Sequence, residues 1–383
     1  MTLLKGITWD HPRGYQPLRA AAACWEKRTG HRLEWDVRTL KEFGDLPVEK
    51  LIDRYDLLII DHPYMGEAGA NGYLLPLNDF LGAGFLASQQ KQSVGPSYES
   101  YSWRGKHYAL PVDAAAQVAV CRRDITDALG WHPPLSTVHL REAAGLLPRQ
   151  YKMAIPLCPT DIWCVFLTLC AQFTVGNFFT AEGIDSAAGS WALELLKQWQ
   201  SFLHPDSLRL NPIQLLDKMA LEENIVYCPF SFGYTNYSRK KFPHHRLTFI
   251  DAPRFGPGEV STLLGGAGIA VSSKSRHRDA CFDFIRYVLD PGIQRTVYYE
   301  NGGQPAHLTT WLDPACNEDC GRFFAGTLDT LRHAYRRSGV PGFNRFQEQG
   351  ADHIHDAVLK NRDGKSVLKQ LNNLYQTLCH AII

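Results

Sequence analysis

The stretch that most constrains the fold is an uninterrupted apolar run, Leu57–Ile60, which ends at Asp61. A strand buried on both faces of a sheet reads as such a run, so this stretch predicts a strand in a parallel sheet covered by helices. An apolar strand in Leu3–Trp9, a helix in residues 17–30 that ends at its glycine, and a strand in residues 33–37 come before it. This alternation of strands and helices predicts the α/β class.

Two near-identical tripeptides follow these strands: Asp10-His11-Pro12 after the first, and Asp61-His62-Pro63 after the apolar run. Ligands of open α/β sheets bind at the carboxyl ends of the strands, so both tripeptides place ionisable side chains where a ligand would lie. The alternative is that aspartate and proline only form the turns there, as both residues favour turns.

Length and charge limit the classes of function. A chain of 383 residues exceeds what one hydrophobic core usually serves, which predicts two lobes. With 40 basic and 39 acidic residues the net charge is +1, so neither nucleic acid nor an anionic membrane is an expected partner. No apolar run reaches the roughly 18 residues that membrane insertion needs. The first residues lack a secretory signal, so the sequence as it stands predicts a cytoplasmic protein, or a periplasmic or extracellular one if a signal peptide has been removed.

Three segments, in order, carry a family resemblance: Gly-Tyr-Leu-Leu-Pro-Leu at residues 72–77, Gly-Lys-His-Tyr-Ala-Leu-Pro at residues 105–111, and residues 265–305. The last segment reads as a glycine loop, a buried strand, two helices and a second glycine loop. In order and spacing the three resemble the extracellular solute-binding proteins of ABC transporters, family 1, the carbohydrate-uptake, maltose-binding-protein-like type. The resemblance implies a two-lobed type II periplasmic-binding-protein fold, with mixed sheets flanked by helices and a helical C-terminal segment.

The resemblance also implies how the chain is divided. Residues 1–112 and 264–309 would form lobe one, and residues 113–263 and 310–383 would form lobe two. A ligand would be held in the cleft between the lobes by hinge closure. The expected partners are a small-molecule ligand and, if the chain is exported, an ABC permease.

The side chains expected in the cleft come from loops on both lobes. Positions carried over from the resemblance are Trp9, Asp10, His11, Arg13, Asp61, His62, Asp113, Thr160, Asp161, Trp163, Tyr234, Asn236, Tyr237, Gly265 and Gly266. Aromatic rings and carboxylates suit a sugar, whereas Arg13 and the two histidines suit a carboxylate or phosphate. We therefore expect a small polar or anionic metabolite, such as a sugar or a carboxylate.

Other functions have less support in the sequence. The chain contains no G-x-S-x-G, P-loop, dinucleotide-binding or H-E-x-x-H motif, so we expect no cofactor and no recognised catalytic centre. An alternative is a cytosolic enzyme on the same scaffold, with His11 and His62 as acid–base candidates oriented by their aspartates. A metal site at Tyr298-Tyr299 is not expected, because successive helical residues point about 100° apart. A third hypothesis is an interaction module that acts through the helical C-terminal segment.

Overall fold

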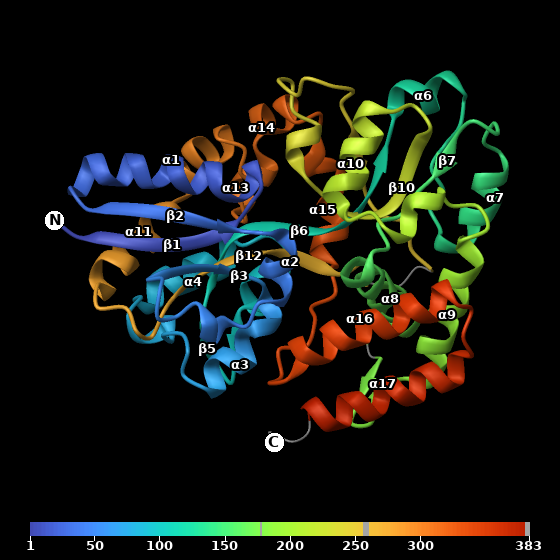
Figure 1. Ribbon diagram of the computed structural model, residues 1–383. Helices are drawn as coiled ribbons and strands as arrows, with labels where there is room; N and C mark the ends of the chain where they lie inside the picture. Colours follow the sequence, from blue (N-terminus) through green and yellow to red (C-terminus); the bar gives the residue numbers. More distant parts are fainter. Residues whose placement is uncertain (177, 256–259, 380–383) are drawn as a thin grey trace.

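The computed structural model describes residues 1–176, 178–255 and 260–379, and a mixed eight-stranded sheet lies at its centre (Figure 1). The strands of this sheet are β1 (Leu3–Trp9), β2 (Arg32–Arg38), β3 (Leu57–Ile60), β6 (Leu110–Cys121), β7 (Lys152–Met153), β10 (Ile225–Phe232), β11 (Thr248–Ile250) and β12 (Leu264–Val271). Their order is β2-β1-β3-β12-β6-β10-β7, and β11 pairs with β6 beside this path. Two small hairpins complete the strands: β4 (Ser102–Trp103) with β5 (Lys106–His107), and β8 (Phe179–Thr180) with β9 (Gly183–Ile184).

Helices surround the sheet, as the α/β class requires. They are α1 (Pro12–Thr29), α2 (Leu40–Asp45), α3 (Met65–Ala70), α4 (Ala83–Gln92), α5 (Ser97–Ser100), α6 (Arg123–Ala128), α7 (Leu140–Gly145), α8 (Pro159–Thr174), α9 (Ser186–Trp199), α10 (Pro212–Leu221), α11 (Arg278–Val288), α12 (Pro291–Ile293), α13 (Leu308–Leu312), α14 (Pro314–Asp319), α15 (Phe323–Arg332), α16 (Phe343–Leu359) and α17 (Gly364–Cys379). Within the described residues, none of them is both long and apolar enough to cross a bilayer.

Strand β3 is buried on both faces, as its apolar run predicts, but the sheet around it is mixed and not parallel, because β3 runs parallel to β1 and antiparallel to β12. Leu57 and Ile59 belong to the hydrophobic core that the sheet shares with α1 and α11. Leu58 and Ile60 point the other way and belong to the core that the sheet shares with α3. All four side chains are fully buried. Because successive side chains of a strand point to opposite faces of the sheet, four consecutive apolar residues contribute to the hydrophobic cores on both faces.

Two long antiparallel strands, β6 and β12, join the lobes of the molecule. The first lobe contains β1, β2, β3, α1 and α11, and the second contains β7, β10, β11, α8, α9, α10, α16 and α17. Residues 110–116 of β6 pair with β12, and residues 117–121 of the same strand pair with β10 and β11. Strand β6 is therefore a shared part of both lobes, and Figure 1 shows it running from one to the other.

The second lobe is built around α8, an apolar helix that is buried over most of its length. Trp163 on this helix is fully buried and packs against Phe166 and Phe346. Gly350 of α16 lies against the Trp163 ring, where a Cβ atom would approach it to 2.8 Å. The C-terminal helices α16 and α17 thus complete the core of the second lobe, and Figure 1 shows them beside α8 and α9.

Residues 333–342, between α15 and α16, run back along the first lobe. Tyr335 exchanges backbone hydrogen bonds with Thr262 and Leu264 at the start of β12. Further along, the Gly342 amide donates to Glu67 Oε2 of α3 at 3.0 Å. A Cβ atom on Gly66 of α3 would overlap the carbonyl oxygen of Gly339, so the helix and this segment touch backbone to backbone.

Replacement of Gly66 by alanine tests this contact. We expect Gly66→Ala to lower the free energy of unfolding by about 1–3 kcal/mol, as overpacking typically does. Gly84→Ala is a matched control, because Gly84 lies in α4 and a Cβ atom added to it would meet nothing within 4 Å beyond its own helix. This control should be neutral or stabilise by about 0.4–1 kcal/mol. Urea unfolding measures both; equal stabilities would contradict the close packing at Gly66.

Candidate functional site

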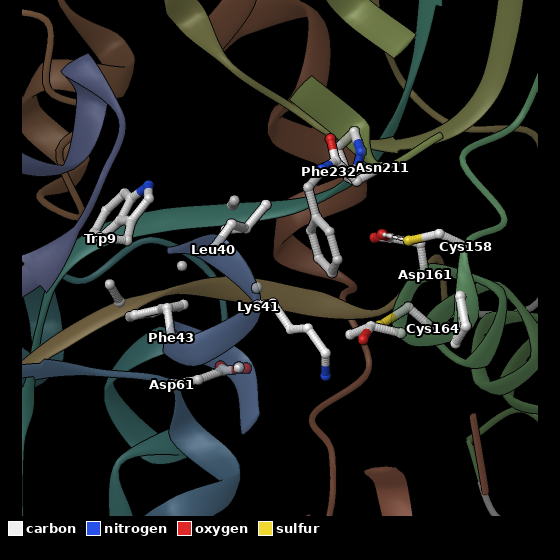
Figure 2. Close-up of a pocket in the computed structure, with 18 of the residues that line it drawn as sticks. Trp9, Leu40, Lys41, Phe43, Asp61, Cys158, Asp161, Cys164, Asn211 and Phe232 are labelled. Atoms are coloured by element: carbon white, nitrogen blue, oxygen red, sulfur yellow. Dashed lines mark hydrogen bonds between the residues drawn. The ribbon is translucent and has the colours of Figure 1, made fainter. Parts of the chain in front are cut away.

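A cavity of about 420 Å³ lies between the lobes, where the carboxyl ends of β1 and β3 face the start of α8 across β6 and β12 (Figure 2). Many of its lining side chains were expected from the sequence. They are Trp9, Arg13, Asp61, Asp113, Thr160, Asp161, Tyr234, Gly265 and Gly266. Residues from both lobes and from the shared strands therefore meet at one cavity, as the position of strand ends predicts.

Sequence reasoning missed the contribution of α2. This short helix brings Leu40, Lys41 and Phe43 to the cavity wall, and Figure 2 shows Phe43 on the same side as Trp9. The Phe43 ring centroid is 5.2 Å from that of Trp9. A usable signal was present: Thr39 and Glu42 form a capping box, the Thr-x-x-Glu pattern that marks a helix start.

The second lobe also adds lining residues that were not predicted. Asn211 and Gln214 cap the start of α10 reciprocally, and this second capping box was visible in the sequence. The remaining additions include Cys158, Cys164, Arg209, Phe232, Arg337, Gln347 and Asp352. Arg337, Gln347 and Asp352 are far along the chain from the other lining residues: Arg337 lies in residues 333–342, and the other two lie on α16.

Arg13 is fully engaged by the protein. Its Nε donates to Asp113 Oδ2 at 2.8 Å and its Nη2 to Oδ1 at 2.5 Å, while Nη1 donates to the Gly233 carbonyl at 2.7 Å. The guanidinium carbon lies 4.6 Å from the centre of the Tyr234 ring. Because its planar fork already holds a carboxylate, Arg13 does not offer a free bidentate site for an anion, which removes our main reason for expecting an anionic ligand.

A second buried ion pair links the lobes at Asp61. Arg337 Nη2 donates to Asp61 Oδ2 at 2.6 Å, and its Nη1 donates to Gln347 Oε1 at 3.0 Å. Burial would raise the pKa of the Asp61 carboxyl, but the Arg337 charge and His62 hold that pKa well below its usual range. For His62, burial and the Arg337 charge lower the pKa to about 4. This imidazole is therefore neutral at physiological pH.

Six residues predicted for the site do not line this cavity: Asp10, His11, His62, Trp163, Asn236 and Tyr237. Asp10 is exposed, and His62 and Trp163 are buried in the lobes. His11 caps α1, since its Nδ1 accepts from the Arg13 amide at 3.1 Å. It lines a wider hollow of about 1470 Å³ together with Asn236 and Tyr237. The two histidines therefore do not meet in the cavity between the lobes.

Asp161 differs from the other buried carboxylates of the cavity. Its side chain is only 7% exposed, yet in the described part of the chain no cation forms an ion pair with it. Its Oδ2 accepts a hydrogen bond from the Cys158 thiol at 3.0 Å, which Figure 2 shows as a dashed line. Burial raises the pKa of Asp161 to about 7. The carboxyl can thus change its protonation state near neutral pH.

Two α/β lobes that share strands and enclose a cavity define the class of two-lobed periplasmic-binding-protein folds. Residues 51–309, more than half of the chain, match the family model described as bacterial extracellular solute-binding protein, and the chain belongs to this family.

Solved structures of solute-binding proteins share the fold over the whole chain. One from Agrobacterium radiobacter K84, in complex with ribitol, is 17% identical with a TM-score of 0.84, covering 98% of each chain. Maltose-bound MalE3 of T. maritima is 16% identical with a TM-score of 0.85, covering 99% of this chain and 100% of that one. One from Agrobacterium vitis S4, with bound D-mannitol, is 14% identical with a TM-score of 0.80, covering 98% of each chain. These similarities confirm the predicted two-lobed fold.

The raised pKa of Asp161 predicts a pH-dependent effect on stability. A carboxyl whose pKa is higher in the folded than in the unfolded protein does not affect the free energy of unfolding below its unfolded pKa, near pH 4. Above that pH it lowers the free energy of unfolding progressively, up to about pH 7. We therefore expect Asp161→Asn to raise the free energy of unfolding at pH 8 by up to a few kcal/mol, and the gain to vanish near pH 4. Urea unfolding at several pH values measures this.

The matched control is Asp352→Asn, because Asp352 lines the same cavity but is exposed to water. Asp352→Asn should change the free energy of unfolding little at any pH. A gain for Asp161→Asn that is the same at pH 4 and pH 8 would contradict the assignment of the effect to the Asp161 carboxylate.

Replacement of Arg337 should lower the free energy of unfolding for a different reason. Arg337→Met leaves the Asp61 carboxylate buried without its partner, which typically costs about 3–5 kcal/mol. Lys360→Met removes an exposed pair, Lys360–Asp356, and should cost less than about 1 kcal/mol. Chemical denaturation at neutral pH compares the two; similar losses would argue against a buried, uncompensated Asp61 charge in the first variant.

Proposed function

We propose that this protein binds a small, polyhydroxylated, sugar-like solute in the cavity between its lobes. The observation that carries the proposal is that all four basic side chains lining the cavity pair with aspartates of the protein: Arg13 with Asp113, Arg337 with Asp61, Lys41 with Asp45 and Arg209 with Asp206. What the cavity then presents is aromatic surface and neutral or acidic hydrogen-bonding groups. Such a surface suits a neutral ligand with many hydroxyl groups better than an anion.

The cavity wall supplies both kinds of contact that a sugar-like molecule uses. Trp9, Phe43 and Phe232 provide flat apolar faces for the C–H groups of a ligand. Asn211 and Gln214 provide amides that both donate and accept hydrogen bonds. The ribitol, maltose and D-mannitol complexes of proteins with this fold support the same class of ligand.

Ligand capture by hinge closure is part of the proposal. The two lobes would be residues 1–112 with 264–309 and residues 113–263 with 310–383, joined through β6 and β12. A small change of direction in these two strands would move one cavity wall toward the other. Since the family is one of extracellular solute-binding proteins, we further propose that the protein acts outside the cytoplasm and delivers its ligand to an ABC permease.

A thermal-shift series with ribitol, D-mannitol and maltose tests the proposal. At least one of them should raise the melting temperature in a saturable way, since a ligand that binds only the folded state stabilises it. Phe43→Ala should weaken that binding by about tenfold through loss of an aromatic contact. Phe80→Ala is the matched control, because Phe80 is similarly half-buried but stacks on Phe282 away from the cavity.

Two results would contradict the proposal. One is stabilisation by small dicarboxylates or phosphates with none by polyols or sugars. The other is equal loss of polyol binding in the Phe43→Ala and Phe80→Ala variants, which would place the ligand elsewhere.

A further inference from the structure

One charge in the cavity is left without a counter-ion. Four aspartates line the cavity, and two of them, Asp61 and Asp113, each accept hydrogen bonds from an arginine. Asp352 is exposed at the mouth. Asp161 alone among the four is buried and, within residues 1–176, 178–255 and 260–379, has a thiol as its hydrogen-bond donor in place of a cation.

The cations nearest the cavity do not compensate Asp161. Lys41 pairs with Asp45 at 2.5 Å on α2, and Arg209 pairs with Asp206 at 2.5 Å. Both side chains are largely exposed to water, and each pairs with an aspartate of its own segment and not with Asp161. The unbalanced buried charge of the cavity is negative, and a ligand that complements this field carries a positive charge.

We infer that the natural ligand carries a protonated amine among its hydroxyl groups, as an amino sugar or amino polyol does, and that Asp161 is its counter-ion. The inference rests on the proposed function and narrows its ligand class. A hydroxyl group would give Asp161 one ordinary hydrogen bond, whereas an ammonium gives a charge-assisted one and removes an uncompensated buried charge. The rings of Trp9, Phe43 and Phe232 also attract a cation through their π faces.

The same arrangement makes the preference dependent on pH. Above about pH 7 the Asp161 carboxylate is charged and attracts the ammonium, and below it the neutral acid does not. Cys158, Cys164, Asp45 and Tyr234 are the other ionisable groups that interact electrostatically with this carboxyl. Lys41, Arg209 and Asp352 line the same cavity. The amine of an aliphatic amino polyol stays protonated at both pH values compared below.

The experiment uses matched ligand pairs that differ only in one hydroxyl replaced by an amine. The probes are D-sorbitol with 1-amino-1-deoxy-D-sorbitol, and D-mannitol with 1-amino-1-deoxy-D-mannitol, measured by titration calorimetry at about pH 8 and pH 5.5. We expect at least one amine to bind about tenfold or more tightly than its parent polyol at pH 8, with the preference falling toward unity at pH 5.5.

Asp161→Asn identifies the residue responsible. This variant keeps the size of the side chain and an acceptor for Cys158, and the ratio of amine affinity to parent affinity at pH 8 should fall to about one. If the variant fails to fold, the wild-type comparison at two pH values still tests the inference, because an amine preference that is equal at pH 8 and pH 5.5 overturns it. Asp10→Asn, at an exposed aspartate that does not line this cavity, should retain the preference.

The outcomes separate this inference from the proposed function. Equal binding of amine and parent at pH 8, or an amine preference that survives in Asp161→Asn, overturns the inference and leaves the polyol-binding function standing. Failure of every probe in both pairs to bind overturns the inference, and if ribitol and maltose also fail to stabilise the protein, the proposed function falls as well.

Discussion

The pairing of β6 with β12 is the interaction on which the rest of the molecule depends. Both strands are at the centre of the sheet, and the backbone shifts register between Ala267 and Gly268. Close to this point a Cβ atom on Gly266 would lie 2.6 Å from the Asp113 carbonyl oxygen, and the residue has a φ of 105°. Only glycine tolerates both conditions, so the close approach of β12 to the Asp113 backbone requires a glycine here.

The two buried ion pairs connect the segments that form the cavity walls. Arg13 comes from the first lobe, yet it binds Asp113 of the shared strand and the Gly233 carbonyl of the second lobe. Arg337 lies in residues 333–342, between α15 and α16, and binds Asp61 of the first lobe. Such pairs often contribute little net stability, because desolvation offsets their attraction. They hold the Asp61 and Asp113 carboxylates, and in the described part of the chain they leave Asp161 without a cation partner.

The sequence predicted the fold better than the chemistry of the site. The apolar run of β3 and the strand-end rule were sufficient to find Asp61 and the loop after β1, since both depend on local pattern. The role of Arg13 could not be predicted, because Asp113 is 100 residues away along the chain and the pair forms only when β6 passes the start of α1. His11 was predicted to lie in the cleft, but its hydrogen-bond partner is local. It accepts from the Arg13 amide as the cap of α1, and this position keeps it from the cavity wall.

The position of β12 also bears on how the chain is made. β3 and β6 pair with β12 and not with each other, so the sheet of the first lobe lacks its central strand until residues 264–271 have been synthesised. Until then one edge of the apolar strand β3 is unpaired, and such edges are templates for aggregation. Contacts this distant in sequence also form slowly. A nascent chain of this protein should therefore depend on chaperones that shield β3 while the second lobe is being translated.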